Sequence, residues 1–399
     1  MSGPAGIERV WEHISARRLL QTTYGFLRIP SVTGQERAFS LHFAACLRDL
    51  GLQVDVDEEF PESPSVIGRW GSGSGPVLQF DGHTDTITTP HAEPRLDLEG
   101  GTVHGRGAAD MKGGLAAVVE ALRALIASGV AVGGSVLVTA HGLHEAPIGD
   151  QRTLHSLIRK GIHGDAAVVV ELGEDFLPLA AKGMAIFRFE ISREGAPMHE
   201  VEAPKDLPHP LWVAGRLLGM LDAWRIRLAE QPDPLLGPES IFLGQVHGGD
   251  FYNRVPVTAR VEGTHRYAAP RTLDDLRADY AALCHRLEVE TGATVRCSLQ
   301  HVGPPFSLQV DEPIVRHVRD AYQAATGREL PLRGINVVGN AADLASMAGI
   351  PAVYHGVNQK TAHSDDEWVG AEDLVRAARV YAATILSYLG EQPCQLAPA

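Results

Sequence analysis

The chain has 399 residues, enough for one large or two ordinary domains at roughly 100–200 residues each. Hydrophobic residues make up 44% and charged residues 21%, which is typical of a soluble globular protein. The formal net charge of −14 argues against nucleic acid or an anionic membrane as a partner. No apolar run approaches the ~20 residues that cross a bilayer, so no membrane span is predicted.

Apolar residues at helical spacing alternate with short apolar runs that are typical of buried strands. The helical patterns cover residues 7–28, 35–50, 113–128, 150–160, 312–325 and 370–389. The strand-like runs cover residues 77–81, 135–140, 166–171 and 351–355. This alternation predicts an α/β fold with helices on both faces of a sheet. Thr33 or Gly34 could cap the second helix, with Glu36 in its first turn.

The middle third of the chain has a different pattern. Strand-like segments at 185–191, 255–261 and 293–300 are separated by helical patterns at 207–223 and 272–289. The order strand, helix, strands, helix, strand indicates a small α+β domain with its helices on one face of the sheet.

The N-terminal residues and the cysteines indicate in which compartment the protein is located. The first residues, MSGPAGIERVWEHI, lack a basic region followed by an apolar core, so no signal peptide is expected. The four cysteines are far apart in sequence and form no CxxC pair: Cys46, Cys284, Cys297 and Cys394. They read as thiols in a reducing compartment, and a cytoplasmic location is predicted.

The stretch from residue 78 to residue 114 carries the first candidate site. A strand runs into the segment GHTDT, where His83 could bind a metal and Asp85 could accept a hydrogen bond from the other ring nitrogen. Asp110 follows 27 residues later (110 − 83), in the segment GRGAADMKGG, and opens an amphipathic helix. Taken alone, His83 and Asp85 could equally form an ordinary hydrogen-bonded turn, and Asp110 could equally be an ordinary helix cap.

Together, GHTDT and GRGAADMKGG resemble the M20 family of metallopeptidases, deacylases and amidohydrolases, especially its acetylornithine deacetylase, succinyl-diaminopimelate desuccinylase and carboxypeptidase G2 members. The resemblance covers nearly the whole chain. It implies that His83 is a metal ligand and that Asp110 bridges two metals. It also implies a discontinuous α/β catalytic domain, residues 1–184 and 306–399. An inserted ferredoxin-like α+β domain, residues 185–305, would act as a lid and form the homodimer.

The same resemblance supplies the other ligands. Glu171, at the end of a strand, falls where the family has a terminal metal-binding carboxylate, and His363 lies in a segment similar to the family's AHxxxE. The implied sites are His83, Asp110 and Glu171 for one metal, and Asp110, Glu145 and His363 for the other. Without the resemblance, Glu171 would read as a surface residue and His363 as a structural one.

The segment THGLHEAP departs from the family pattern. The family usually has two adjacent glutamates here, the first a general base and the second a ligand; in this chain His144 takes the base position and Glu145 the ligand position. A neutral imidazole, with a free pKa near 6.5, can take and return a proton near neutral pH. Three alternatives stay open: His144 binds metal and Glu145 is the base, His141 takes part, or the site is inactive.

Four further residues match family positions that face substrate. His199, in GAPMHE, would reach the partner subunit's site and stabilise the oxyanion. Asn253 would face the substrate, and Arg266 would clamp a substrate carboxylate, a role that Arg254 could also fill. Asn340 lies in GNAAD, similar to a glycine-rich turn whose backbone donors hold an anion. Ordinary loop or surface roles are the alternatives.

These features predict a cytoplasmic, homodimeric hydrolase that cleaves the amide C–N bond of an N-acyl amino acid or dipeptide with metal-activated water. Two divalent ions are expected, zinc first and manganese or cobalt as alternatives, because the ligands are imidazole and carboxylate without thiolate. Two other functions stay open. One is a hydrolytic deaminase of a small aromatic or cyclic amine, and the other is a catalytically silent binding protein.

Overall fold

The computed structural model describes residues 4–392, and the chain divides into two compact units. The first unit comprises the described parts of residues 1–179, 308–333 and 339–399; the second comprises residues 180–307 and 334–338. The units divide at residues 179/180 and 307/308, where the sequence predicted 184/185 and 305/306. Residues 334–338 join the second unit, where the N–H of Lys182 donates to the carbonyl of Ile335.

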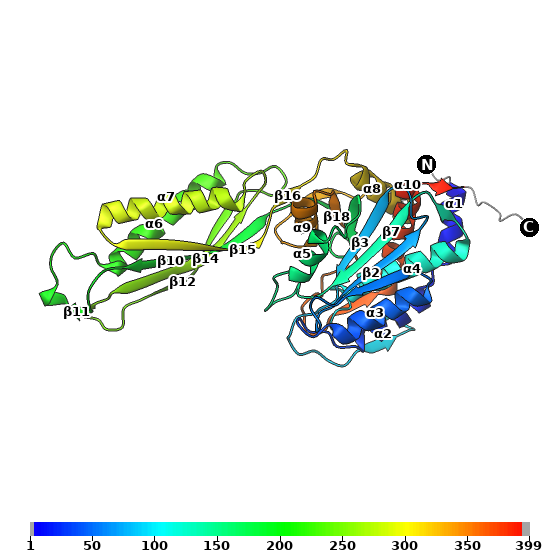
Figure 1. Ribbon diagram of the computed structural model, residues 1–399, viewed down its shortest axis with the longest axis horizontal. Coiled ribbons are helices and arrows are strands. Elements are labelled where there is room, and N and C mark those ends of the chain that lie inside the picture. Colours follow the sequence, from blue (N-terminus) through cyan, green and yellow to red (C-terminus); the bar gives the residue numbers. More distant parts are fainter. Residues whose placement is uncertain (1–3, 393–399) are drawn as a thin grey trace, which may run out of the picture. The chain divides into compact units, whose positions relative to one another are not determined.

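The first unit is built on a six-stranded mixed sheet (Figure 1). Its strands, in spatial order, are β1 (Gln53–Asp57), β2 (Ser65–Gly71), β7 (Ser135–His141), β3 (Val77–His83), β8 (Ala166–Val169) and β18 (Ala352–Tyr354). The four strands from β7 to β18 are parallel, whereas β1 and β2 run antiparallel at one edge. The carboxyl ends of the parallel strands therefore meet at a single edge.

Helices cover both faces of this sheet, as predicted. They are α1 (Pro4–Trp11), α2 (Ala16–Leu27), α3 (Arg37–Asp49), α4 (Lys112–Ser128), α5 (Arg152–Arg159), α8 (Pro313–Thr326), α9 (Asn340–Asp343), a π-helical turn (Leu344–Ala348) and α10 (Ala371–Leu389). On β2, Ile67 packs with Leu157 of α5, while the adjacent Gly68 lies against Leu47 of α3. Because successive strand residues point to opposite faces, α5 and α3 lie on opposite sides.

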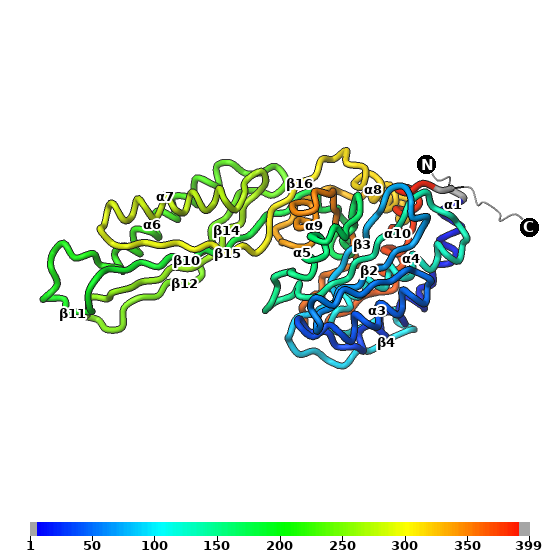
Figure 2. Tube along the Cα trace, in the orientation of Figure 1, coloured from blue at the N-terminus to red at the C-terminus, as the bar shows by residue number. Residues whose placement is uncertain are grey.

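The predicted helix over residues 7–28 is two helices. Ser15 caps α2 by accepting the N–H of Arg18, and its own N–H donates to Glu120 of α4. This local hydrogen bonding competes with a continuous helix, so the chain turns between α1 and α2. Figure 2 follows the trace from these first helices to α10, which packs against both α2 and α4.

The start of α4 is fixed by a close contact with the sheet. A Cβ added to Gly114 would lie 2.0 Å from the carbonyl oxygen of Val170, just after β8. Only glycine permits this approach of helix and strand backbones. The contact brings Asp110, which precedes α4, to the same edge of the sheet as Glu171.

The second unit contains a four-stranded antiparallel sheet and two helices. Its strands are, in spatial order, β12 (Ser240–Gly248), β14 (Thr258–Tyr267), β10 (Gly183–Ser192) and β15 (Thr294–Gly303), and its helices are α6 (Pro210–Ala229) and α7 (Leu273–Thr291). Phe187 and Phe189 of β10 pack with Leu217 of α6 and Tyr280 of α7. The second unit thus has strands and helices around one core, as an α+β domain does, and it includes β12, which was not anticipated from the sequence.

Short strands complete the two units. They are β4 (Arg95–Asp97), β5 (Thr102–His104), β6 (Ala131–Val132), β9 (Leu177–Ala181), β11 (Met198–His199), β13 (Arg254–Val255), β16 (Phe306–Ser307), β17 (Leu332–Ile335), β19 (Trp368–Gly370) and β20 (Glu391–Gln392). A 3₁₀ turn spans Glu200–Glu202. The pairing of β19 with β5 brings the segment before Trp368 beside residues 105–110. Within residues 4–392, no helix is both long and apolar enough to cross a membrane.

Candidate active site

Strand register places the first candidate ligands level with one another. His83 pairs with His141 across β3 and β7, and Asp81 pairs with Val169 across β3 and β8. Glu171, two residues beyond Val169, is therefore level with His83. Their nearest oxygen and nitrogen, Oε2 of Glu171 and Nε2 of His83, are 3.9 Å apart.

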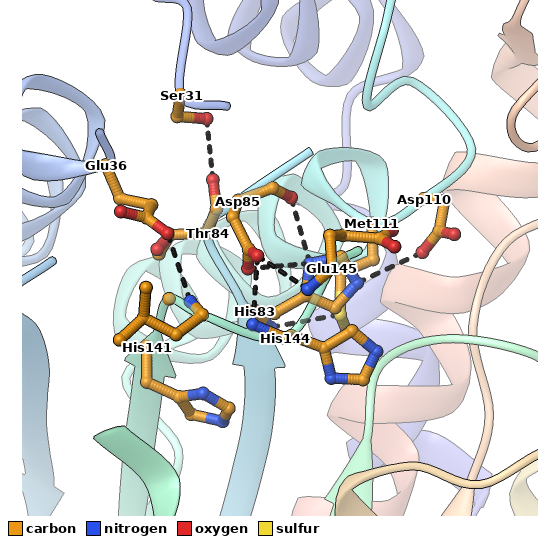
Figure 3. Close-up of polar contacts among 12 residues, drawn as sticks. Ser31, Glu36, His83, Thr84, Asp85, Asp110, Met111, His141, His144 and Glu145 are labelled. Atoms are coloured by element: carbon orange, nitrogen blue, oxygen red, sulfur yellow. Dashed lines mark hydrogen bonds and ion pairs between the residues drawn. The ribbon is translucent and has the colours of Figure 1, made fainter. Parts of the chain in front are cut away.

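Asp110 lies between two imidazoles. Its Oδ1 is 3.1 Å from Nε2 of His83, and its Oδ2 is 3.1 Å from Nε2 of His363. The same nitrogen of His363 is 3.0 Å from Oε1 of Glu145. The structure thus brings together the five residues expected as ligands, with the carboxylate of Asp110 shared between the two halves. Figure 3 shows His83, Asp110 and Glu145 converging.

A buried ion pair holds Asp110 in place. Oε1 of Glu367 accepts the N–H groups of Ala109 and Asp110 at 2.9 and 3.0 Å. Its Oε2 accepts from Arg106 at 2.7 Å, and both side chains are almost completely buried. This pair was not predicted from the sequence, where the only signal was that Glu367 ends the segment AHSDDE.

Asp85 is arranged differently from the expectation. Nδ1 of His83 donates to the backbone carbonyl of Asp85 at 3.0 Å, whereas the carboxylate Oδ1 of Asp85 is 3.5 Å from that nitrogen. The other oxygen, Oδ2, accepts the N–H groups of His144 and Glu145 at 2.9 and 2.7 Å. Asp85 therefore fixes the ring of His83 through its backbone and the loop after β7 through its side chain (Figure 3).

Glu36 is a second carboxylate that holds this loop. It is fully buried, and its Oε1 accepts the N–H groups of Gly34 and Leu143 at 2.8 and 3.0 Å. Its Oε2 accepts the hydroxyl of Ser63. Glu36 was predicted in the first turn of a helix, but α3 begins at Arg37 and no side chain caps it. Glu36 instead turns towards the loop because the buried N–H groups there need an acceptor.

His144 stacks on His83, with ring centroids 4.2 Å apart and planes 2° from parallel. Its Nδ1 lies 2.9 Å from Oδ1 of Asn340. The side chain of Asn340 is fully buried, and its partners are Asp81, His141 and His144. That the backbone donors of its turn hold a substrate anion stays a prediction.

Two sets of side chains at this edge are spaced to hold cations. The groups His83, Asp110 and Glu145, and His83, His144 and Glu171, each offer ligand atoms within 4.8 Å of one another. Imidazole and carboxylate donors suit zinc, manganese or cobalt. In the set around Glu171 the third member is His144, where the sequence predicted Asp110.

The charges of the cluster support the fit to metal ions. Burial and the nearby charge of Asp110 raise the pKa of Glu171 to about 8, and hydrogen bonds to Asp110 and Glu145 raise that of His363 to about 10. Burial lowers the pKa of His83, but Asp110 and Asp85 outweigh it and raise that pKa well above its usual value. Among residues 4–392, no lysine or arginine pairs with Asp110, Glu145 or Glu171. Bound cations would provide the missing compensation.

The remaining predicted residues belong to the second unit. Nδ1 of His199 accepts the N–H of Val201 at 3.3 Å, and its Nε2 lies 3.1 Å from Nδ2 of Asn253. His199 is exposed. The guanidinium of Arg266 donates to the carbonyl of Asn336, and Arg254 pairs with Asp250.

Comparison with known proteins identifies the family. The sequence pattern of peptidase family M20/M25/M40 matches residues 80–387. A succinyl-diaminopimelate desuccinylase from Methylocella silvestris is 30% identical over 386 residues, which cover 91% of this chain and 96% of the relative. The crystal structure of the aminopeptidase PepT from Bacillus cereus has a TM-score of 0.78 at 19% identity and covers 94% of this chain and 98% of its own.

A second solved structure, the YXEP protein of Bacillus subtilis, is described as a dinuclear metal-binding peptidase of the M20 family. Its TM-score is 0.68 at 16% identity, with 94% of this chain and 98% of its own covered. These likenesses confirm the α/β fold class expected from the sequence. The chain belongs to the M20 peptidase family and is a hydrolase.

Proposed function

We propose that the protein hydrolyses the amide bond of an N-acyl amino acid, using two divalent cations at the edge of the six-stranded sheet where the parallel strands end. The observation that carries this proposal is the position of Asp110, whose two oxygens face the imidazoles of His83 and His363. The similarity to a desuccinylase over almost the whole chain favours an N-acyl amino acid over a dipeptide. The compound in that relative's name, succinyl-diaminopimelate, carries carboxylates, and a substrate of this protein would carry one as well.

The proposed reaction adds water to the amide carbonyl, breaks the C–N bond and releases a carboxylic acid and an amine. When bound, the two cations would polarise the carbonyl and lower the pKa of water. His144 would accept the proton of the attacking water at Nε2 and return it to the leaving nitrogen. We favour His144 over Glu145 in this role, because Oε1 of Glu145 is already directed at His363. Asp85 and Glu36 would hold both residues in place through backbone N–H groups.

We propose zinc as the metal, held by His83, Asp110 and Glu171 on one side and by Asp110, Glu145 and His363 on the other. Elemental analysis of protein purified without chelator should give close to two equivalents per chain. Asp110→Ala should lose most of this metal because it removes the shared carboxylate. Asp366→Ala is the matched control, since Asp366 is exposed and lies on the segment that carries His363. Equal metal content in both variants would contradict the bridged site.

The substrate class is tested by measuring amine and carboxylic acid release from a panel of N-acyl amino acids and dipeptides. Release of both products in equal amounts, abolished in Asp110→Ala, is the expected result. Release of ammonia without a carboxylic acid, from a second panel of small aromatic and cyclic amines, would indicate the deaminase alternative. No turnover of the compounds in either panel by the fully metallated protein would favour a binding protein.

We also propose a homodimer formed through the second unit. The edge strand β12 exposes apolar side chains, with Phe242 66% and Val246 49% exposed, and a bare apolar edge favours pairing. In such a dimer His199 would act in the partner's site. Mixing the inactive variants His199→Ala and Asp110→Ala would then restore about a quarter of wild-type activity, because half of the dimers carry one intact site. Absence of recovery after subunit exchange would exclude a shared site.

A cytoplasmic location completes the proposal. Its support is the state of the cysteines, since Cys46, Cys284 and Cys297 are all unpaired in the described part of the chain, and Cys394 lies outside it. Cell fractionation tests this directly, and recovery in an oxidising compartment would contradict it.

A further inference from the structure

A buried carboxylate that is not one of the expected ligands lies on the same strand as His83. Asp81, on β3, is fully buried and accepts hydrogen bonds from Thr139 at 2.5 Å and from Nδ2 of Asn340 at 2.8 Å. His141 lies 3.3 Å away. Both oxygens of Asp81 accept hydrogen bonds, Oδ2 from the hydroxyl of Thr139 and Oδ1 from the amide of Asn340, so this carboxylate is an anionic acceptor in the cluster.

This anion sets the orientation of Asn340. An amide has a donor end and an acceptor end, and the acceptor end cannot face a carboxylate favourably. Nδ2 of Asn340 must therefore point at Asp81, which leaves Oδ1 facing Nδ1 of His144 at 2.9 Å. Since Oδ1 can only accept, Nδ1 of His144 must carry the ring proton.

The other nitrogen of His144 is then an unprotonated acceptor in the neutral ring. Among the described residues, no group forms a hydrogen bond with Nε2 of His144. The stack on His83 fixes the plane of the ring at the edge where the ligands converge. The chain from Asp81 through Asn340 thus selects one of two tautomers and also one ring orientation.

We infer that Asp81 and Asn340 are positioning residues, which hold His144 with its proton on Nδ1 and the lone pair of Nε2 directed into the active site. The catalytic part of this inference rests on the proposed role of His144 as proton acceptor. The tautomer itself does not, because it follows from the hydrogen-bond chain alone.

The decisive experiment exchanges the two groups. Asp81→Asn removes the anion that orients the amide, and Asn340→Asp places two carboxylates face to face. The double variant, Asp81→Asn with Asn340→Asp, restores one amide and one carboxylate, and the introduced carboxylate can accept from both neighbours. Asp343→Asn is the matched control, because Asp343 is a buried carboxylate on the same helix that pairs with His155 and does not contact His144.

Two readouts separate positioning from a general structural role. The first is the ¹⁵N shift of the His144 ring in metal-free, histidine-labelled protein, assigned by its loss in His144→Gln. The second is steady-state kinetics at matched metal content. We expect the wild type and the double variant to show the Nδ1-protonated form, and Asp81→Asn and Asn340→Ala to lose it. Asn340→Asp should keep it, because the introduced carboxylate still accepts from Nδ1 of His144. We expect kcat to fall about 10- to 100-fold in Asp81→Asn and Asn340→Ala, with KM little changed, and to recover in the double variant.

The inference fails if Asp81→Asn keeps the Nδ1-protonated form. It also fails if Asp81→Asn loses metal in proportion to activity, because that outcome would mean that Asp81 only helps to assemble the ligands. If Asp81→Asn does not fold, Asn340→Ala carries the same test, since it leaves Asp81 with Thr139 and His141. Should the protein prove to lack hydrolase activity, the ring shifts still decide the tautomer, and the two proposals are thereby judged separately.

Discussion

The carboxylate of Asp85 accepts the backbone N–H of Glu145 at 2.7 Å. The same oxygen accepts the N–H of His144 at 2.9 Å. Asp85 is fully buried, and its backbone carbonyl also receives Nδ1 of His83. One residue therefore ties the ends of two parallel strands together, and the spacing between His83 and Glu145 depends on it.

We predict that Asp85→Asn weakens metal binding at least about 10-fold, the usual cost of losing a group that orients metal ligands. The amide still has an oxygen to accept one N–H, but it lacks the negative charge that strengthens both bonds. Competition with a chromophoric chelator would measure the affinity. Asp366→Asn, which neutralises an exposed carboxylate near the site, should bind metal as the wild type does. Equal affinities in the two variants would show that Asp85 does not organise the ligands.

Metal binding should release protons. With pKa values of about 8 for Glu171 and about 10 for His363, both groups carry a proton at pH 7 in the metal-free protein. A cation binds only the deprotonated forms, so loading the site at pH 7 should release more than one proton per chain.

Calorimetric titration in buffers of different ionisation enthalpy would count these protons. Raising the pH to 9, above the pKa of Glu171 and below that of His363, should reduce the count by close to one. A count that does not change between pH 7 and pH 9 would contradict the protonated state of Glu171.

The convergence of the expected ligands could be predicted in large part because they lie in short segments with fixed spacing. His83 ends β3, Asp110 precedes α4 and Glu171 follows β8, and the edge of a parallel sheet brings such positions together. The pairing of His363 with Asp110 across 253 residues (363 − 110) came from the family resemblance, since no local pattern encodes it.

The supporting residues could not be predicted in the same way. Glu36, Asp81 and Glu367 read as ordinary acidic residues in sequence, and only burial gives them their roles. A buried carboxylate is stable where it accepts hydrogen bonds from N–H groups or hydroxyls of distant segments, and such contacts exist only in the tertiary structure. The break between α1 and α2 has the same origin, because the backbone N–H of Ser15 finds its acceptor on Glu120 of α4.

The buried histidine His355 should make the protein less stable in acid. Burial, with a smaller contribution from Arg376, lowers its pKa to about 3. Between pH 6.5 and that value, the unfolded chain binds a proton that the native chain does not. Unfolding is therefore favoured as the pH falls below about 6.5, by about 1.4 kcal/mol for each pH unit.

His355→Gln removes this titration, so the loss of stability between pH 7 and pH 5 should shrink by about 2 kcal/mol. Urea unfolding of metal-free protein at the two pH values would measure it. His91→Gln, at an exposed position, should leave the pH dependence unchanged. If both variants lose as much stability in acid as the wild type, His355 is not neutral in the native protein.

The approach of α4 to the sheet can be tested with two glycines in helices of the same unit. A Cβ at Gly114 would lie 2.0 Å from the carbonyl oxygen of Val170, whereas a Cβ at Gly25 of α2 meets nothing within 4 Å. Gly114→Ala must therefore push α4 away from β8, at a cost of about 1–3 kcal/mol in unfolding free energy. Gly25→Ala should instead stabilise the protein by about 0.5–1 kcal/mol, since alanine favours a helix.

Urea unfolding followed by far-UV circular dichroism would compare the two variants with the wild type. Gly114→Ala should also bind metal more weakly, because α4 follows directly from Asp110 and its displacement moves that carboxylate away from Glu171. Gly25→Ala should leave metal affinity unchanged, since α2 supplies none of the proposed ligands. If the two substitutions shift stability and affinity in the same direction, the contact between Gly114 and Val170 does not set the position of Asp110.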